Sequence, residues 1–246
     1  MAMVARRGFR PRSDRPDLPF PADLAPEAAA RLAERLAHYS FRLFLRGAIL
    51  RRGDFAPEEA TRYLSAAPAS ALAEALVEMG ILLRAPGNRY RFVRAATSFG
   101  GTLEWYVARE LRRRLGCDVA TGIKFGASGV GGDLDVIAAT EGKLIYLELK
   151  SSPPKHLTRG EVTAFFARVR ALRPDVAVFA MDTALRLGDR VLPMLAAELA
   201  GTAPRRVERD LWALTPHLYA VSAKPDLAGN ICRAIAAGLL ALGPTP

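Results

Sequence analysis

A stretch of apolar residues interrupted by charges, from Gly131 to Ser152, constrains the fold of this chain more than any other. Its sequence, GGDLDVIAATEGKLIYLELKSS, predicts two buried β-strands and a tight turn, because turn-forming residues separate two short apolar runs. Charged side chains almost never enter buried strands unless they are paired or bind a metal. Four charged residues nevertheless lie in these runs: Asp133, Asp135, Glu148 and Lys150.

The positions of these charges predict a chemical site. Side chains alternate across a strand, so Asp133 shares a face with Asp135, and Glu148 shares one with Lys150. Two carboxylates at the ends of adjacent strands form a hard oxygen site suited to Mg²⁺. A lysine beside them can orient or deprotonate a water molecule and stabilise charge on a phosphate. The alternative is a surface hairpin with one salt-bridged face, but apolar residues on both faces favour burial.

Asp135, followed by Glu148 and Lys150 on paired strands, resembles the active site of the PD-(D/E)xK nuclease superfamily. GGDLDVIA and LIYLELKSS look most like the variant in Mrr-type restriction endonucleases and Holliday-junction resolvases, with Leu134 in place of the proline. The resemblance implies that Asp135 and Glu148 bind metal with the backbone carbonyl of Leu149, and that Lys150 serves the attacking water. It also implies an α/β fold with a restriction-endonuclease-like mixed sheet flanked by helices, and Mg²⁺ or Mn²⁺ as cofactor.

A further carboxylate lies on the helix expected from Thr102 to Leu115. An apolar residue recurs there at every fourth position, which predicts one core-facing stripe, and Glu104 lies at its margin. In the resembling nucleases an acidic residue on the first core helix often completes the metal site, and Glu104 matches that position. The alternative is that Glu104 is a favourable charge at a helix N-terminus.

The segment before this helix has a different pattern. Helices followed by a hairpin resemble a winged helix-turn-helix domain, and EALVEMGILLRAPGNRYRF is the most characteristic part. The first helical region is either one long helix or two that break near Tyr39. The expected elements are helical sequence at 26–52, a short helix at 58–64, a turn at 67–70, a helix at 71–79, and strands at 81–84 and 89–93.

The winged-helix pattern suggests binding to DNA, but its third helix offers few donors for base edges and carries two carboxylates. Backbone contact through the hairpin, or a role in structure or assembly, is therefore favoured over base reading. The candidate nucleic-acid contacts on the hairpin are Arg84, Arg89 and Arg91. Lys155, in a loop after the charged strand pair, is a candidate phosphate contact, with an exposed turn as the alternative.

Three segments follow from these patterns. Residues 1–24 mix arginine and proline, which predicts a disordered basic tail that is either inert or adds non-specific nucleic-acid affinity. Residues 25–95 form the winged helix-turn-helix-like domain, and residues 96–246 the nuclease-like domain. Within the last segment we expect a strand at 117–125, a helix opened by a capping box at 158–161, a strand at 176–181, a helix at 190–199, a strand at 218–221 and a helix at 227–240.

Composition limits the remaining possibilities. Half of the 246 residues are hydrophobic, which predicts a sizeable core, and the formal net charge of +10 suits a phosphate-bearing partner. The two cysteines are far apart and the three histidines are scattered, so neither a disulfide framework nor a zinc site is expected. We find no apolar run of membrane-spanning length and no secretory signal, and therefore expect a cytoplasmic protein.

The sequence thus predicts a metal-dependent nuclease that hydrolyses phosphodiester bonds, with DNA as the expected substrate. Two alternatives stay open: the same chemistry on RNA, and a non-catalytic nucleic-acid-binding or regulatory protein that retains the nuclease fold. Cutting two strands would favour a homodimer. No membrane partner is expected.

Overall fold

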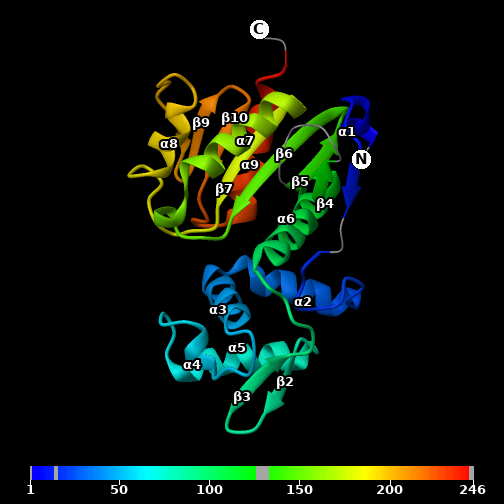
Figure 1. Cartoon of the computed structure of the whole chain (residues 1–246), viewed down its shortest axis with the longest axis vertical. Coiled ribbons are helices and arrows are strands. Elements are labelled where there is room, and N and C mark those ends of the chain that lie inside the picture. Colours follow the sequence, from blue (N-terminus) through cyan, green and yellow to red (C-terminus); the bar gives the residue numbers. More distant parts are fainter. Residues whose placement is uncertain (1, 14–15, 126–132, 244–246) are drawn as a thin grey trace. The chain divides into compact units, whose positions relative to one another are not determined.

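The protein is described by a computed structural model covering residues 2–13, 16–125 and 133–243 (Figure 1). The chain divides into two compact units. We call residues 16–106 the helical unit, and residues 1–15 with 107–246 the sheet unit. Helix α6 (Gly100–Leu115) crosses this division, so its first turns belong to the helical unit and the rest to the sheet unit.

The helical unit contains short helices followed by a two-stranded hairpin. His38 adopts an extended conformation (φ −83°, ψ 123°) and separates two helices. Of the two alternatives for this region, two helices that break near Tyr39 is therefore the correct one. The hairpin turn uses Gly87 and Asn88, both with positive φ, which these residues tolerate well. The elements are α2 (Pro26–Ala37), α3 (Tyr39–Leu50), α4 (Pro57–Ala60), α5 (Ala66–Glu78), β2 (Leu82–Ala85) and β3 (Arg89–Phe92).

One expectation in this unit was wrong. Residues 67–70 do not form a turn, because α5 already begins at Ala66. Pro68 therefore lies in the first turn of the helix, where its missing N–H costs nothing because that group has no partner within the helix. The serine at the N-cap of this helix is Ser65, five residues before the end of the expected turn.

The sheet unit is built on one mixed sheet flanked by helices, as the sequence predicted (Figure 1). Its strand order is β1-β4-β5-β6-β7-β10-β9-β8, with β6, β7 and β10 parallel to one another. Helices α7 and α8 pack against one face of the sheet and form a hydrophobic core with it. Helix α9 packs against β7 and β10. The strands after β1 are β4 (Asp118–Phe125), β5 (Asp133–Thr140), β6 (Lys143–Lys150), β7 (Val176–Met181), β8 (Arg205–Glu208), β9 (Leu211–Thr215) and β10 (Leu218–Val221). The helices after α6 are the 3₁₀ turn η1 (Pro154–His156), α7 (Arg159–Leu172), α8 (Val191–Ala197) and α9 (Leu227–Leu240).

The strand register lines up a row of side chains across the sheet. Glu148 pairs with Phe179, Phe179 with Ala220, Ala220 with Trp212, and Trp212 with Arg206. Residues paired across strands lie on the same face. The ring of Phe179 lies 5.2 Å from that of Phe165 on α7, so this row lies on the face that α7 covers.

The N-terminal residues differ from the expected disordered tail. Helix α1 (Ala2–Arg6) buries Val4, and β1 (Pro11–Ser13) pairs antiparallel with β4 at the edge of the sheet. Phe20, in the helical unit, is fully buried. The disorder prediction was therefore wrong for these described residues. An edge strand offers unpaired N–H and C=O groups to any extended segment, and local composition does not reveal that opportunity.

Two further strands, β8 and β9, were also missed. β8 is an exposed edge strand with the sequence RRVE, and it lacks the apolar alternation by which strands are identified. β9 follows through a tight turn in which Asp210 has φ of 64°. Among the described helices, none is long and apolar enough to span a membrane.

Candidate active site

The hairpin of β5 and β6 brings the charged residues together. Glu141 and Gly142 form its turn, both with positive φ, and Val136 pairs with Leu147. One step further along this register, Asp135 lies beside Glu148 on the same face. The backbone N–H of Leu149 donates a hydrogen bond of 2.6 Å to Oδ2 of Asp135.

Glu148 is held by a set of buried partners. Its residue is only 2% exposed. Arg168 on α7 donates from Nη2 to both carboxylate oxygens at 2.8 Å, and the hydroxyl of Tyr146 donates to Oε2. Arg168 Nε also donates to the Tyr146 oxygen at 2.8 Å. A buried carboxylate is tolerated only with such compensation, and these bonds fix the orientation of Glu148.

Lys150 lies between two carboxylates. Its Nζ is 3.0 Å from Oε1 of Glu148 and 3.2 Å from Oε1 of Glu161. Glu161 also accepts hydrogen bonds from Thr158, which confirms the capping box at the start of α7. Burial opposes charge on Lys150, but the neighbouring carboxylates outweigh it and raise its pKa. Lys150 is therefore a cation at neutral pH.

Asp135 has a perturbed acidity. Burial, and then the charge of Glu148, raise its pKa to about 7, against the opposing effects of the Leu149 N–H, Lys150 and Arg168. Burial disfavours the charged form of a carboxyl group, and a second carboxylate beside it adds to that effect. Within the described part of the chain, the neighbours of the three carboxylates Asp135, Glu148 and Glu161 include two cations, Lys150 and Arg168.

Carboxylate oxygens are the kind of donor that a hard divalent cation takes. Within residues 2–13, 16–125 and 133–243, no cluster of three or more His, Cys, Asp or Glu side chains is arranged to hold a metal. Mg²⁺ needs fewer protein ligands, since it keeps several waters and uses one or two carboxylates. A bound cation would stabilise the charged form of Asp135, which burial and the neighbouring Glu148 disfavour.

The other predicted site residues lie in different places. Leu149 contributes its N–H to Asp135, and the role of its carbonyl stays a prediction. Glu104 lies on the part of α6 that belongs to the helical unit, and its metal role also stays a prediction. Lys155 lies on η1, in the segment that follows Lys150.

The hairpin arginines of the helical unit form ion pairs with carboxylates of the same unit. Arg84 pairs with Glu74, and Arg91 pairs with Asp54. Arg89 lies 3.1 Å from Glu59 and also donates to the carbonyl of Asp54 at 2.6 Å. Their guanidinium groups are thus already engaged within the unit.

Sequence reasoning missed two partners in the site, Tyr146 and Arg168. Tyr146 was read only as an apolar strand residue, although its position two residues before Glu148 places both side chains on one face. Arg168 offered a clearer signal, because it follows Phe165 by three residues on the buried stripe of α7. An arginine within an apolar stripe indicates a buried carboxylate partner.

Comparison with known proteins bears on the fold. No protein-family model and no curated protein matches the chain. Protein VC1899 from Vibrio cholerae matches with a TM-score of 0.58 and 17% identity, over 96% of this chain and 61% of that protein. Can2 from Sulfobacillus thermosulfidooxidans, solved in complex with cyclic tetra-adenylate, matches with a TM-score of 0.55 and 15% identity, over 95% of this chain and 59% of Can2. The chain spans about three fifths of each protein, and at these identities the likeness shows a similar fold.

Proposed function

We propose that this chain is a metal-dependent nuclease of the PD-(D/E)xK type that hydrolyses phosphodiester bonds, with DNA as the first substrate to test. The single observation that carries the proposal is the placement of Lys150 against Glu148, with Asp135 at an elevated pKa on the neighbouring strand. Perturbed carboxylates beside a buried cation are typical of reactive sites. The restriction-endonuclease-like and winged-helix assignments of the two units belong to the same proposal.

The residues divide the work of hydrolysis. Asp135, Glu148 and the carbonyl of Leu149 would hold Mg²⁺ or Mn²⁺, which, when bound, polarises the scissile phosphate and lowers the pKa of a water molecule. Lys150, protonated at neutral pH, donates hydrogen bonds to the water or the phosphate and offsets the negative charge that develops there. It does not act as the general base. Arg168 is a positioning residue that keeps Glu148 oriented.

The bond changes are those of simple hydrolysis. The oxygen of a water molecule forms a bond to phosphorus, and the bond from phosphorus to the leaving sugar oxygen breaks. The proton lost by the water passes to solvent, and the leaving oxygen takes up a proton. No oxidant or reductant is needed.

One observation favours a second candidate function, a non-catalytic protein that keeps the fold. Both oxygens of Glu148 are already engaged by Arg168, Tyr146 and Lys150, and a purely structural ionic cluster would have this arrangement. Can2 binds a cyclic oligonucleotide, and a phosphate-bearing ligand without cleavage would suit this alternative for the present chain. The metal-dependent reaction on RNA is a variant of the first proposal.

Cleavage assays separate these functions. Wild-type protein is incubated with Mg²⁺ or Mn²⁺ and duplex, branched and single-stranded DNA and RNA. Lys150→Ala is the test variant, and Lys143→Ala, a half-buried lysine at the other end of the same strand, is the matched control. We expect metal-dependent cleavage that Lys150→Ala lowers on the order of a hundredfold while Lys143→Ala leaves it unchanged. Equal rates in the two variants, or no cleavage of any substrate, would overturn the proposal.

A further inference from the structure

One cavity of the sheet unit is lined by basic side chains and an aromatic ring. Its volume is about 510 Å³, and the loop after β7, the β8–β9 turn and the loop after β10 line it. The basic residues among its lining are Arg186, Arg206, Arg209 and Lys224, and its aromatic residue is Trp212. Two aspartates also line it, Asp189 and Asp210.

The cationic groups of this cavity are only weakly engaged by the protein. Arg186 and Lys224 are exposed, and no described residue forms an ion pair with either. Within the described ranges, Arg206 donates to the carbonyl of Glu208 at 3.3 Å, and Arg209 lies 3.6 Å from Asp210 while its side chain is 80% exposed. Four cations facing two aspartates leave a net positive charge available to a phosphate.

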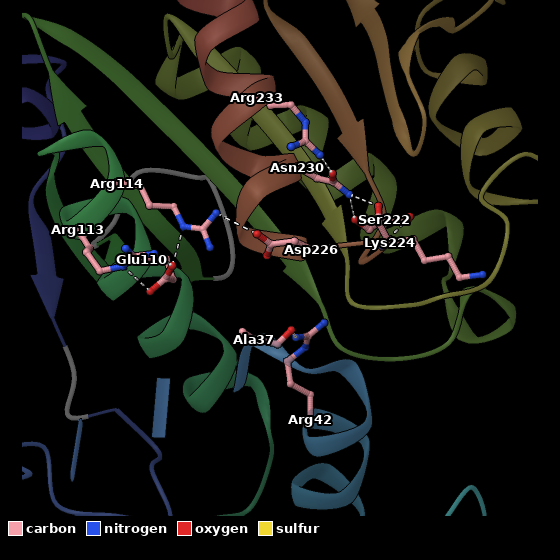
Figure 2. Close-up of polar contacts among 10 residues, drawn as sticks. All are labelled: Ala37, Arg42, Glu110, Arg113, Arg114, Ser222, Lys224, Asp226, Asn230 and Arg233. Atoms are coloured by element: carbon pink, nitrogen blue, oxygen red, sulfur yellow. Dashed lines mark hydrogen bonds and ion pairs between the residues drawn. The ribbon is translucent and has the colours of Figure 1, made fainter. Parts of the chain in front are cut away.

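The walls of the cavity are fixed by buried hydrogen bonds. Asn230 donates from Nδ2 to the carbonyls of Ser222 (2.8 Å) and Lys224 (2.5 Å), as Figure 2 shows. The hydroxyl of Ser222 donates to Asp210 at 3.0 Å, which joins the β8–β9 turn to this loop. The Lys224 side chain extends away from these bonds (Figure 2). The backbone is thus preorganised while the ammonium group stays accessible.

The cavity and the catalytic residues lie on the same face of the sheet. The paired row described above runs from Glu148 on β6 to Trp212 on β9, but its middle members, Phe179 and Ala220, are fully buried, so a ligand cannot follow the row itself. The closer link is at the end of the strands, where the N–H of Asp182, just before the loop that lines the cavity, donates to the carbonyl of Lys150 at 2.8 Å. Adjacent strands are about 4.8 Å apart, so the backbones of Glu148 and Trp212 are separated by ~14 Å.

We propose that this cavity binds a single-stranded segment of nucleic acid next to the scissile phosphate, with a base stacked on Trp212 and phosphates held by Arg186, Arg206, Arg209 and Lys224. An aromatic platform within a positively charged groove is the combination that holds unpaired strands, because every base has a face to stack. A duplex keeps its bases stacked on one another and cannot supply one to Trp212. The inference rests on the proposed function and narrows its substrate to unpaired nucleic acid.

Tryptophan fluorescence tests binding directly. The protein has two tryptophans, so Trp105→Phe leaves Trp212 as the only one. This protein is titrated in EDTA, which prevents cleavage, with oligothymidylate about 12 nucleotides long. A duplex of the same length and inorganic polyphosphate are titrated in parallel. We expect saturable quenching with the single strand alone.

A second experiment measures binding after the charge of two cavity arginines is reversed. Arg186→Glu with Arg209→Glu is compared with Arg6→Glu with Arg170→Glu, a pair of exposed arginines on α1 and α7 of the same unit. Both double variants change the net charge equally and alter only exposed side chains. We expect the cavity variant to weaken binding on the order of tenfold at low salt and the control far less.

Each failure has its own meaning. Binding without a change in Trp212 fluorescence, equal weakening by the two double variants, or no binding to the wild type would overturn the inference. Equal quenching by duplex or polyphosphate would also overturn it, because a stacked single strand is then not the ligand. If the protein cleaves nucleic acid in a Lys150-dependent way but the cavity variants bind it normally, the cavity proposal fails and the proposed nuclease function stands. If a single strand quenches Trp212 fluorescence but the wild type cleaves no substrate, the proposed nuclease function fails and the cavity proposal stands.

Discussion

Two regions of this protein pair arginines with carboxylates, and they differ in burial. In the sheet unit, Arg168 and Glu148 meet under α7 with side chains 8% and 3% exposed. In the helical unit, Arg84 and Glu74 form a similar pair with side chains 67% and 37% exposed. Water screens the second pair and is excluded from the first. The comparison teaches that burial, rather than the number of ion pairs, decides where a charge carries energetic and chemical weight.

Removing Arg168 should have the largest effect on stability. Arg168→Leu leaves Glu148 buried without its main partner, which should cost about 3–5 kcal/mol in the free energy of unfolding. Urea unfolding measures this change. Adding Glu148→Gln to Arg168→Leu should restore part of the loss, because the uncompensated charge is then gone. If Arg168→Leu lowers the free energy of unfolding by less than about 1 kcal/mol, the buried ion pair contributes no more than an exposed one, and the comparison is wrong.

The acidity of Asp135 predicts a smaller, pH-dependent effect. Its ordinary pKa is 3.8 and its folded pKa is about 7, so between these values the folded protein holds a proton that the unfolded chain has lost. The contribution of Asp135 to stability therefore falls as pH rises through this window. Without metal, Asp135→Asn should gain stability relative to wild type between pH 5 and 8, on the order of 2 kcal/mol. A difference that stays constant with pH would show that Asp135 titrates normally.

The hairpin should give the smallest effects. Arg84→Ala and Arg91→Ala should each leave the free energy of unfolding nearly unchanged, because their ion pairs are exposed and screened by water. Arg89→Ala should weaken nucleic-acid binding equally for all sequences and by less than about threefold, since Arg89 is already engaged by Glu59 and Asp54. Binding measured against salt and sequence checks this. A strong sequence preference that disappears in Arg89→Ala would show that the hairpin reads bases.

The sequence predicted those parts of the fold that have local signals. The strand pair with Asp135 and Glu148, the capping box at Thr158 and the last helix (Leu227–Leu240) were confirmed. These elements carry their own periodicity, turn residues or caps.

The rest depends on distant partners. β1 is a strand because the edge of β4 accepts it, and β8 is a strand because β9 does. The same limit applies to the site: the charges on β6 were visible, but their balance by Arg168 depends on how α7 packs. Long-range pairing of this kind leaves no local pattern in the chain.

The central claim is that Asp135 and Glu148 form a metal site, and calorimetric titration with Mn²⁺ tests it most directly. We expect one saturable site in the wild type at pH 8, weakened at pH 6 because protons compete for Asp135. Asp135→Asn should abolish this site, while Asp133→Asn, an exposed aspartate on the same strand, should retain it. Undiminished Mn²⁺ affinity in Asp135→Asn, or no binding by the wild type, would contradict the account.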